Sequence, residues 1–442
     1  MDNVLDPQDQ TAFFIGQVAG TCLLQCVWLY NRAIDIDGLR QFHDHLKCGR
    51  LARRIERSPL RFGRHRWTSP TGAPNIEIVA SARPREEFGT WLSEQADTPI
   101  DPEDGPGWHL AALPFSNGGA GVSLLISHCL TDGVGLSEAL ADAACGRHDP
   151  ISWPAAGSRT RWQAVREDAR QTVRDAPAIG RAVVTAARVA KRRRGNPEAA
   201  TPPPALSAGA DNPITLPMAT IFVDADEWDT RAHALGGTSN ALLVGLAARL
   251  AHRRGRASAD GSVVVRMPVN QRAEGDTRAN AVTNVDVIVD PSSATTDLRE
   301  IRAAIKQTLI RHREAPDEEQ AAMAIVPLLA LVPERFLLRV GGGNATGVVS
   351  SNLGVVNPAA SRPDGTDADR FAMKWLYRGV TKAMMDGSGG LQFLLSGRAN
   401  RHIFVSVTAY QPGHTNSNDS LREDISRTLN DFSLTGTYLE RP

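Results

Sequence analysis

The chain of 442 residues has no excess of charge of either sign, because 49 Lys and Arg residues are balanced by 49 Asp and Glu residues. Proteins whose main partner is a nucleic acid usually carry a basic excess, so the composition gives that function class no support. Aromatic residues make up only 5% of the chain, which does not suggest a stacking platform for bases. Nucleic acid is therefore not an expected partner.

Cysteine is also scarce, and its spacing excludes the common metal and redox motifs. The number of cysteines is odd, no two of them form a CxxC pair, and the histidines add no spacing typical of zinc ligands. We therefore expect reduced thiols in a cytosolic protein, and no metal site. The cysteines are Cys22, Cys26, Cys48, Cys129 and Cys145.

One uncharged run, from Phe13 to Tyr30, comes near the lower length limit of a membrane span. It contains Gln17, Thr21 and Gln25, and the residues before it (MDNVLDPQDQ) are not the basic region of a signal peptide. We predict a short helix followed by a buried strand instead.

Strands and helices alternate in both halves of the chain, which predicts an α/β protein. The length is too great for one ordinary core, so we expect two lobes. The clearest linker is the Pro- and Ala-rich segment that begins at Gly195. The predicted organisation is a first lobe over 1–194, a linker over 195–217 and a second lobe over 218–442.

Residues 159–194 have helical periodicity with an expected break near Pro177, and they hold 11 Arg or Lys residues against 3 acidic ones. The segment ends in KRRR. The simplest interpretation is a solvated helix end, where cations also complement the helix dipole. The other interpretation is peripheral contact with anionic lipid head groups, or with the phosphates of an acyl carrier protein.

Local patterns predict several elements around this framework. Asp37 is an expected N-cap for a helix whose apolar face carries Leu39, Phe42 and Leu46. Residues 107–127 predict two strands around a Gly-rich hairpin, and another helix is expected from about Ser239.

The stretch SHCLTDGVG, at 127–135, carries the main candidate for chemistry. Val122–Ser127 predicts a buried strand, so His128 falls where the chain leaves the sheet, and Asp132-Gly133 predicts a turn into a helix. Imidazole is the side chain best suited to proton transfer near neutral pH. His109, in GPGWHL, has no acid beside it in the sequence, and we interpret it as a packed or surface residue.

Several stretches together resemble the condensation-domain superfamily, whose members have the chloramphenicol acetyltransferase-like fold. The nearest branches are the wax ester synthase/diacylglycerol acyltransferases and the polyketide-associated acyltransferases. The similar stretches are HxxxDG at His128, AIDIDGLRQFHDHL, TSNALLVGLAARLAHRRG, VRMPVNQR and SSNLGVV. The resemblance implies two similar lobes that form a pseudo-dimer, with a cleft or tunnel between them.

Two positions depart from the family pattern. Many members have HHxxxDG, and here Ser127 stands at the first histidine position. Wax ester synthases often carry an Asn-Asp pair where this chain has Asn240 and Ala241. The DFGWG motif of plant-type members is absent.

The resemblance implies acyl transfer with His128 as general base. A hydroxyl acceptor would attack a thioester carried by coenzyme A or by the phosphopantetheine of a carrier protein, and no cofactor would be bound permanently. A stand-alone condensation enzyme that forms an amide, and a member that has lost catalysis and only binds, remain alternatives.

The resemblance also implies that Asp132 points away from the histidine and pairs with an arginine, for which Arg272 is the candidate. Asp132, Gly133 and Arg272 are then structural supports of the site. The oxyanion or substrate contacts could come from polar residues on the relevant strands and turns, each of which is alternatively a turn or backbone-bonding residue. These candidates are Asn270, Asn284, Ser351 and Asn352.

Overall fold

The computed structural model describes residues 3–18, 20–70, 72, 75–147, 151–194, 213–273, 275–314 and 347–439. Most of the predicted linker, 195–212, lies outside the described residues, so the lobe boundary there stays a prediction. The elements of the first half are α1 (Pro7–Val18), β1 (Thr21–Tyr30), α2 (Ile36–Cys48), β2 (Arg54–Glu56), β3 (Arg66–Thr68), β4 (Glu77–Ile78), η1 (Arg85–Glu87), α3 (Phe88–Ala96), β5 (Trp108–Pro114), β6 (Ala120–Ser127), α4 (Gly133–Ala144) and α5 (Arg161–Arg194).

The second half again alternates strands and helices, as the sequence predicts. Its elements are β7 (Met218–Asp224), α6 (Ala225–Ala234), α7 (Ser239–Arg253), β8 (Val263–Asn270), β9 (Val282–Val289), α8 (Arg299–Glu314), β10 (Val348–Val355), η4 (Pro358–Ser361), β11 (Arg370–Arg378), α12 (Lys382–Gly387), β12 (Leu391–Ala399), β13 (His402–Tyr410), α13 (Asn418–Asp431) and β14 (Thr437–Tyr438).

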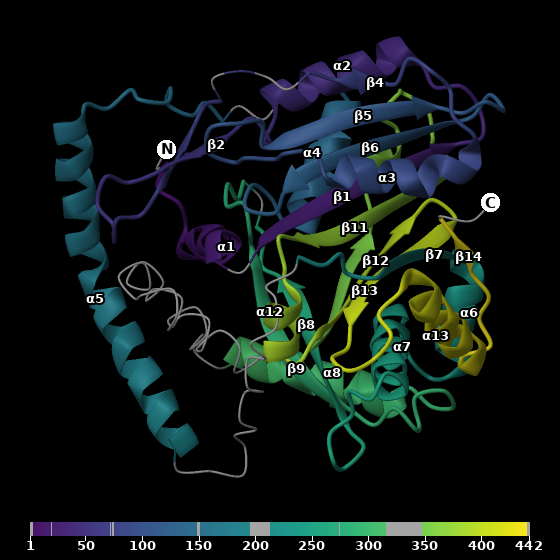
Figure 1. Ribbon diagram of the computed structural model, residues 1–442. Helices are drawn as coiled ribbons and strands as arrows, with labels where there is room; N and C mark the ends of the chain where they lie inside the picture. Colours follow the sequence, from purple (N-terminus) through teal and green to yellow (C-terminus); the bar gives the residue numbers. More distant parts are fainter. Residues whose placement is uncertain are drawn as a thin grey trace.

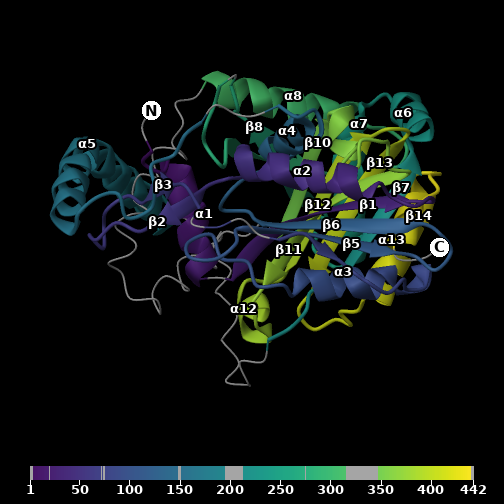
Figure 2. The same ribbon diagram turned by 90° about the horizontal axis from the view of Figure 1, so that it is seen from above.

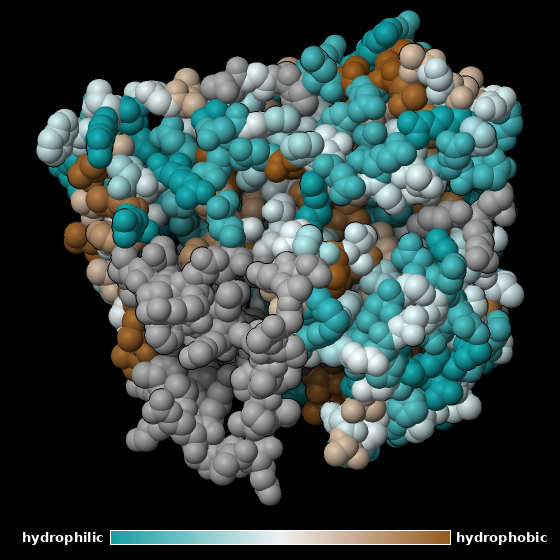
Figure 3. All heavy atoms as spheres, viewed as in Figure 1, coloured by the Kyte–Doolittle hydropathy of each residue, from teal (hydrophilic) through white to brown (hydrophobic). Residues whose placement is uncertain are grey.

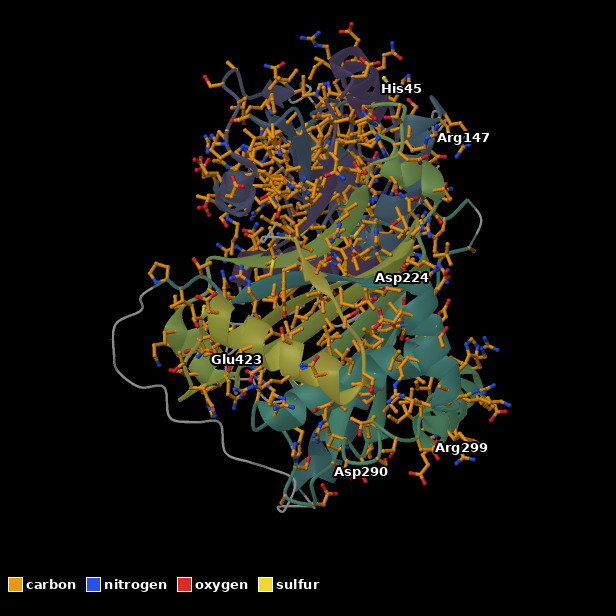
Figure 4. The ribbon with its side chains drawn as sticks, turned by 90° about the vertical axis from the view of Figure 1, so that its right-hand side faces the viewer. His45, Arg147, Asp224, Asp290, Arg299 and Glu423 are labelled. Atoms are coloured by element: carbon orange, nitrogen blue, oxygen red, sulfur yellow. The ribbon has the colours of Figure 1, made fainter. Side chains whose placement is uncertain are left out.

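Two large sheets form the centres of two lobes. The first sheet has the order β11-β1-β6-β5-β4, and the second has the order β14-β7-β13-β12-β10-β8-β9. In Figure 4, His45 and Arg147 mark the first lobe, and Asp290 and Arg299 lie at the far end of the second. This two-lobed α/β arrangement agrees with the predicted fold class, and the cleft between the lobes stays a prediction.

The first sheet includes one strand from the second half of the chain. β11 pairs with β1 in antiparallel register from Thr21–Arg378 to Leu29–Arg370 and forms the edge of that sheet (Figure 1). β11 also packs against β12 and β13 of the second sheet. The two sheets therefore share a core across this strand.

Helices α6, α7, α8 and α13 cover one face of the second sheet (Figure 1). Within that sheet, β10 runs parallel to β12 along most of its length, but it meets β8 through the single pair Val349–Arg266. The ends of β8 and β10 therefore separate beyond this pair, on the side toward the first lobe.

The uncharged run near the N-terminus folds as predicted, into helix α1 and buried strand β1. Among the described residues, no helix is long and apolar enough to cross a membrane.

Two local expectations were wrong. The N-cap of α2 is Asp35, whose carboxylate accepts from the backbone N–H groups of Asp37 and Gly38. Asp37 is the second residue of the helix, because α2 begins at Ile36, earlier than the apolar pattern indicates. The predicted apolar face of Leu39, Phe42 and Leu46 is buried, as expected.

The long basic helix does not break at Pro177, because α5 runs without interruption from Arg161 to Arg194. Proline removes one backbone hydrogen bond from a helix interior. The carbonyl that loses its donor is that of Val173, and both Pro177 and Val173 lie on the exposed side of the helix.

Trp28 on β1 ties the two halves together. Its side chain is fully buried, its Nε1 donates to the carbonyl oxygen of Ala360 at 2.8 Å, and its ring packs against Phe42 and Phe371. The single side chain thus contacts both halves of the sequence.

We expect Trp28→Ala to lower the free energy of unfolding by about 3–5 kcal/mol, because a large cavity opens and the Ala360 carbonyl loses its donor. Trp162→Ala is the control, since Trp162 is 83% exposed and its loss should change stability by no more than about 0.5 kcal/mol. Urea unfolding followed by far-UV circular dichroism measures both. Equal effects of the two variants would contradict this role of Trp28.

Candidate active site

His128 lies directly after β6, a strand in which every residue is buried. Its backbone N–H donates to the carbonyl oxygen of Cys22 on β1 at 3.0 Å. Its carbonyl oxygen accepts from Nδ2 of Asn280, a residue of the second lobe, at 3.2 Å. The backbone of this half-buried histidine is therefore fixed from both lobes at once.

Asp132 uses both carboxylate oxygens away from the histidine. Oδ1 accepts from the backbone N–H of Gly135 at 2.7 Å, which caps helix α4. Oδ2 accepts from Nη2 of Arg272 and from the backbone N–H of Ala281, each at 2.8 Å. Asp132 thus joins α4 to the second lobe.

Arg272 completes a buried ion pair, since the side chains of Asp132 and Arg272 are each only 3% exposed. Its guanidinium also donates to the carbonyl oxygens of Arg278 and Ala279. These bonds hold the segment after β8 in a closed loop beneath α4. The predicted partners therefore contact each other, as the resemblance implied.

Gly133 and Gly135 allow the two lobes to approach closely. A Cβ atom on Gly133 would lie 2.7 Å from a methyl carbon of Leu353 on β10, and one on Gly135 would lie 2.9 Å from Nη2 of Arg272. A side chain at Gly133 would require Leu353 to move, and one at Gly135 would require the Arg272 guanidinium to move.

Two of the predicted oxyanion candidates have their amides engaged elsewhere. Asn270 is exposed, and its side-chain oxygen accepts from the backbone N–H of Arg272. Asn352 accepts from Gly354 at 2.8 Å and donates to the side-chain oxygen of Asn240 at 3.4 Å. Both side chains therefore make local structural bonds.

The other two candidates lie on strands of the second sheet. Asn284 is on β9 opposite Pro268, and Ser351 is on β10 beside Leu395 of β12; both are half-buried. Among the described hydrogen bonds, none joins Asn284 or Ser351 to His128.

His109 lies on β5 and has partners of its own. Its Nε2 is 3.1 Å from a carboxylate oxygen of Glu77 and 3.1 Å from the side-chain oxygen of Gln95. It is a packed residue of the first sheet.

Asp9 is a site residue that the sequence interpretation missed. It is fully buried at the start of α1, and its carboxylate accepts from the backbone N–H groups of Ala279 at 3.0 Å and Asn280 at 2.7 Å. It also accepts from Nδ2 of Asn280, the group that donates to the His128 carbonyl. Burial raises the pKa of Asp9 to about 6, although the Arg53 charge opposes the rise.

Arg53 was missed as well. Its guanidinium donates twice to the carbonyl oxygen of Leu130 and once to that of Thr277, and it lies over the Trp67 ring. Burial lowers the pKa of Arg53 to about 10. Arg53, a buried cation of the first lobe, therefore holds the His128 loop in addition to Arg272 of the second lobe.

Little in the linear pattern marks these residues. An acid in the first turn of a helix is common because it complements the helix dipole. The one available signal is that Asp9 lies four residues before Phe13, on the face that the apolar pattern predicts to be buried. An acid on a buried face indicates a specific partner.

Cys129, next to His128, is not a nucleophile of this site. It is buried, and burial raises the pKa of its thiol to about 11, so the thiol stays protonated at neutral pH. Among the described residues, no group of three or more His, Cys, Asp or Glu side chains could hold a metal ion.

No family model and no curated protein matches this sequence. Solved structures do match over nearly the whole chain. The first condensation domain of the calcium-dependent antibiotic synthetase, in complex with a substrate analogue, has 14% identity and a TM-score of 0.58, and the match covers 99% of both chains. The chain has the fold of condensation domains.

Two further solved structures with this fold are an acyltransferase and a polyketide synthase associated protein. The wax ester synthase/diacylglycerol acyltransferase from Marinobacter aquaeolei VT8 has 14% identity and a TM-score of 0.54, with 98% of both chains covered. Polyketide synthase associated protein 5 from Mycobacterium tuberculosis has 13% identity and a TM-score of 0.55, with 96% of both chains covered. The condensation-domain fold implied by the sequence motifs is therefore confirmed.

Arg272→Met should lower the free energy of unfolding by about 3–5 kcal/mol, because it leaves the Asp132 carboxylate buried without its cation. The matched control is Arg266→Met on β8, the strand that precedes Arg272; its ion pair with Asp286 is partly exposed, and the substitution should cost about 0–1 kcal/mol. Chemical denaturation compares the two variants. A loss at Arg272 no larger than that at Arg266 would show that the buried pair does not support the site.

Asp9 should make stability depend on pH with a definite sign. Because its pKa is raised from 3.8 to about 6 in the folded protein, the folded state binds this proton more tightly than the unfolded chain. The contribution of protonated Asp9 is present at low pH and is lost as the pH rises through about 6. The free energy of unfolding of the wild type, relative to Asp9→Asn, should fall by roughly 1–3 kcal/mol from about pH 4 to about pH 7.

Urea denaturation of the wild type and Asp9→Asn across this pH range tests the sign. A difference that grows as the pH rises would mean that Asp9 has a lowered pKa, like an ordinary surface carboxylate in an ion pair.

Proposed function

We propose that the protein transfers an acyl group from a thioester donor to a hydroxyl acceptor, with His128 as the general base. One observation carries the proposal. His128 is half-buried where the two lobes meet, with its backbone held from both sides, in a fold shared over almost the full length with condensation domains and an acyltransferase. Donor and acceptor would reach it along the junction between the lobes.

In the proposed step, a neutral ring nitrogen of His128 accepts the proton of the acceptor hydroxyl as its oxygen attacks the thioester carbonyl carbon. The tetrahedral intermediate then expels the sulfur, and the imidazolium returns its proton to the thiolate. An ester and a free thiol result. General base catalysis of this kind contributes about 10²–10⁴ in rate.

Direct transfer fits the residues around His128 better than an acyl-enzyme. The Cys129 thiol is protonated, and the sequence has no GxSxG nucleophile motif. Both oxygens of Asp132 are engaged by Gly135, Ala281 and Arg272. We therefore assign to Asp132 the role of holding the loop, and the proton-transfer role to His128 alone.

Ser351 is the candidate that we favour as a contact for the oxyanion or the substrate. It lies two residues before Leu353 on β10. Leu353 is the residue that meets Gly133, directly after Asp132. Ser351 therefore lies two residues from the point where β10 contacts the histidine loop, and Asn284 remains a weaker candidate.

The acyl donor in this proposal is acyl-coenzyme A or an acylated carrier protein, both of which present the same pantetheine thioester. A condensation reaction that forms an amide is the alternative favoured by the similarity to a condensation domain. A binding protein without catalysis is the alternative favoured by Ser127 and Ala241.

The test is thiol release from coenzyme A donors with C2 to C18 acyl chains, in the presence of mixed alcohols and amines. We expect release that needs an acceptor and that falls by about 10²–10⁴ in His128→Ala, the range assigned to a general base. His109→Ala is the control, because it removes a histidine of the same sheet that is bonded to Glu77 and Gln95. Its activity should stay within a few-fold of the wild type.

A donor and acceptor pair that reacts equally well with His128→Ala would exclude His128 as the base. If no coenzyme A donor reacts, the same panel is repeated with acylated carrier proteins. Product mass then separates ester from amide, and the absence of any product would favour the binding role.

A further inference from the structure

Helix α5 stands at one side of the molecule, apart from both sheets (Figures 1 and 2). It has 34 residues, and at 1.5 Å per residue it is about 51 Å long. The proposed chemistry at His128 uses none of its residues. Its two faces differ sharply in charge.

Asp168 and Asp175 lie on the face of α5 toward the protein body, whereas Glu167 is exposed and pairs with Arg159, just before the helix. Asp168 is 1% exposed and accepts from Ser58 as well as pairing with arginines. The ion pairs are Arg64–Asp175 at 3.4 Å, Arg66–Asp168 at 3.2 Å, Arg159–Asp168 at 2.9 Å and Arg159–Glu167 at 3.5 Å. These pairs neutralise the three carboxylates of the helix and anchor its first half.

The outer face carries an apolar stripe. Three turns of a helix take about 11 residues, so Trp162, Val173 and Val184 lie on one face. They are 83%, 73% and 48% exposed. Figure 3 shows hydrophobic atoms between polar ones along the left edge, where Figure 1 places α5.

Arginines lie along one side of this stripe. Arg166, Arg170, Arg174 and Arg181 are all exposed. The three acids of α5 are paired with other arginines, Asp168 and Asp175 with the protein body and Glu167 with Arg159. The outer face of the described part of α5 thus combines exposed apolar side chains with a row of arginines beside them.

We propose that the outer face of α5 is a docking surface for an anionic lipid membrane. A helix that lies in the plane of a membrane surface needs an apolar stripe for the acyl boundary and cations for the head groups, with Trp favoured at the interface. The charge of the outer face is complementary to anionic head groups, and its exposed tryptophan fits the membrane interface. The proposal stands independently of the proposed chemistry at His128.

The experiment is co-sedimentation of the full-length protein with vesicles of phosphatidylcholine containing about 30% phosphatidylserine, compared with pure phosphatidylcholine. We expect binding to the anionic vesicles that weakens at least tenfold when the salt concentration rises from about 0.1 M to about 0.5 M. The triple variant Arg166→Glu, Arg170→Glu, Arg174→Glu should weaken binding at least tenfold. Trp162→Ala should weaken it several-fold.

The matched control reverses three exposed arginines outside α5, Arg299→Glu, Arg401→Glu and Arg427→Glu. It changes the net charge by the same amount and should bind within a few-fold of the wild type. The thermal unfolding midpoint checks that each variant is folded. We expect no large change in it, because none of the substituted arginines belongs to the ion pairs that anchor α5.

Binding that is equal on neutral and anionic vesicles, or that falls equally in the two triple variants, overturns the proposal. So does a lack of binding by the wild type. If the α5 variant instead loses only its reaction with carrier-bound donors, the surface belongs to an acyl carrier protein and not to a membrane.

Discussion

The ion pair between Asp132 and Arg272 is the interaction on which the candidate site depends. Both side chains are almost out of contact with water, so each charge would be costly without the other. The pair also explains why the aspartate cannot orient the histidine, because its two oxygens are used by Arg272, by Ala281 and by the N-terminus of α4. The Asp132 carboxylate therefore joins the two lobes, and His128 lies at their junction.

The backbone of His128 is held by residues that are far apart in the chain. Cys22 accepts its N–H, Asn280 donates to its carbonyl, and Asp9 holds Asn280 from the opposite side. These bonds close a ring of contacts from the N-terminal helix through the second lobe to the histidine loop. Strand β11 and Trp28 bind the same two lobes at the level of the sheets. The site therefore belongs to neither lobe alone.

The outer helix is connected to this centre by a short series of contacts. Arg64 pairs with Asp175 of α5 and also donates to the carbonyl oxygen of Leu5, just before α1. Asp9 lies in the first turn of α1, four residues after Leu5. The position of α5 is thus fixed relative to the first lobe and to the histidine loop. If α5 docks on a membrane as proposed, this arrangement sets the distance from the lipid surface to His128.

The apolar pattern of the sequence determined much of the architecture. Alternating strands and helices, the hairpin of β5 and β6, and the position of His128 at a strand end all follow from local periodicity, which depends on near neighbours. The motif around His128, with PVNQR and SSNLGVV, indicated the fold, because these residues form the junction that the fold requires.

Only the tertiary structure decided the partners. Asp9, Asn280 and Arg53 are ordinary residues in sequence, and their roles come from burial beside groups up to 271 positions away. Strand β11 comes from the second half of the chain and joins the first sheet by pairing with β1. No local sequence pattern encodes pairing between strands that are so far apart in the chain. The same holds for α5. Its composition and helical period were visible in the sequence, but which face is covered was decided only when arginines of the protein body paired with Asp168 and Asp175.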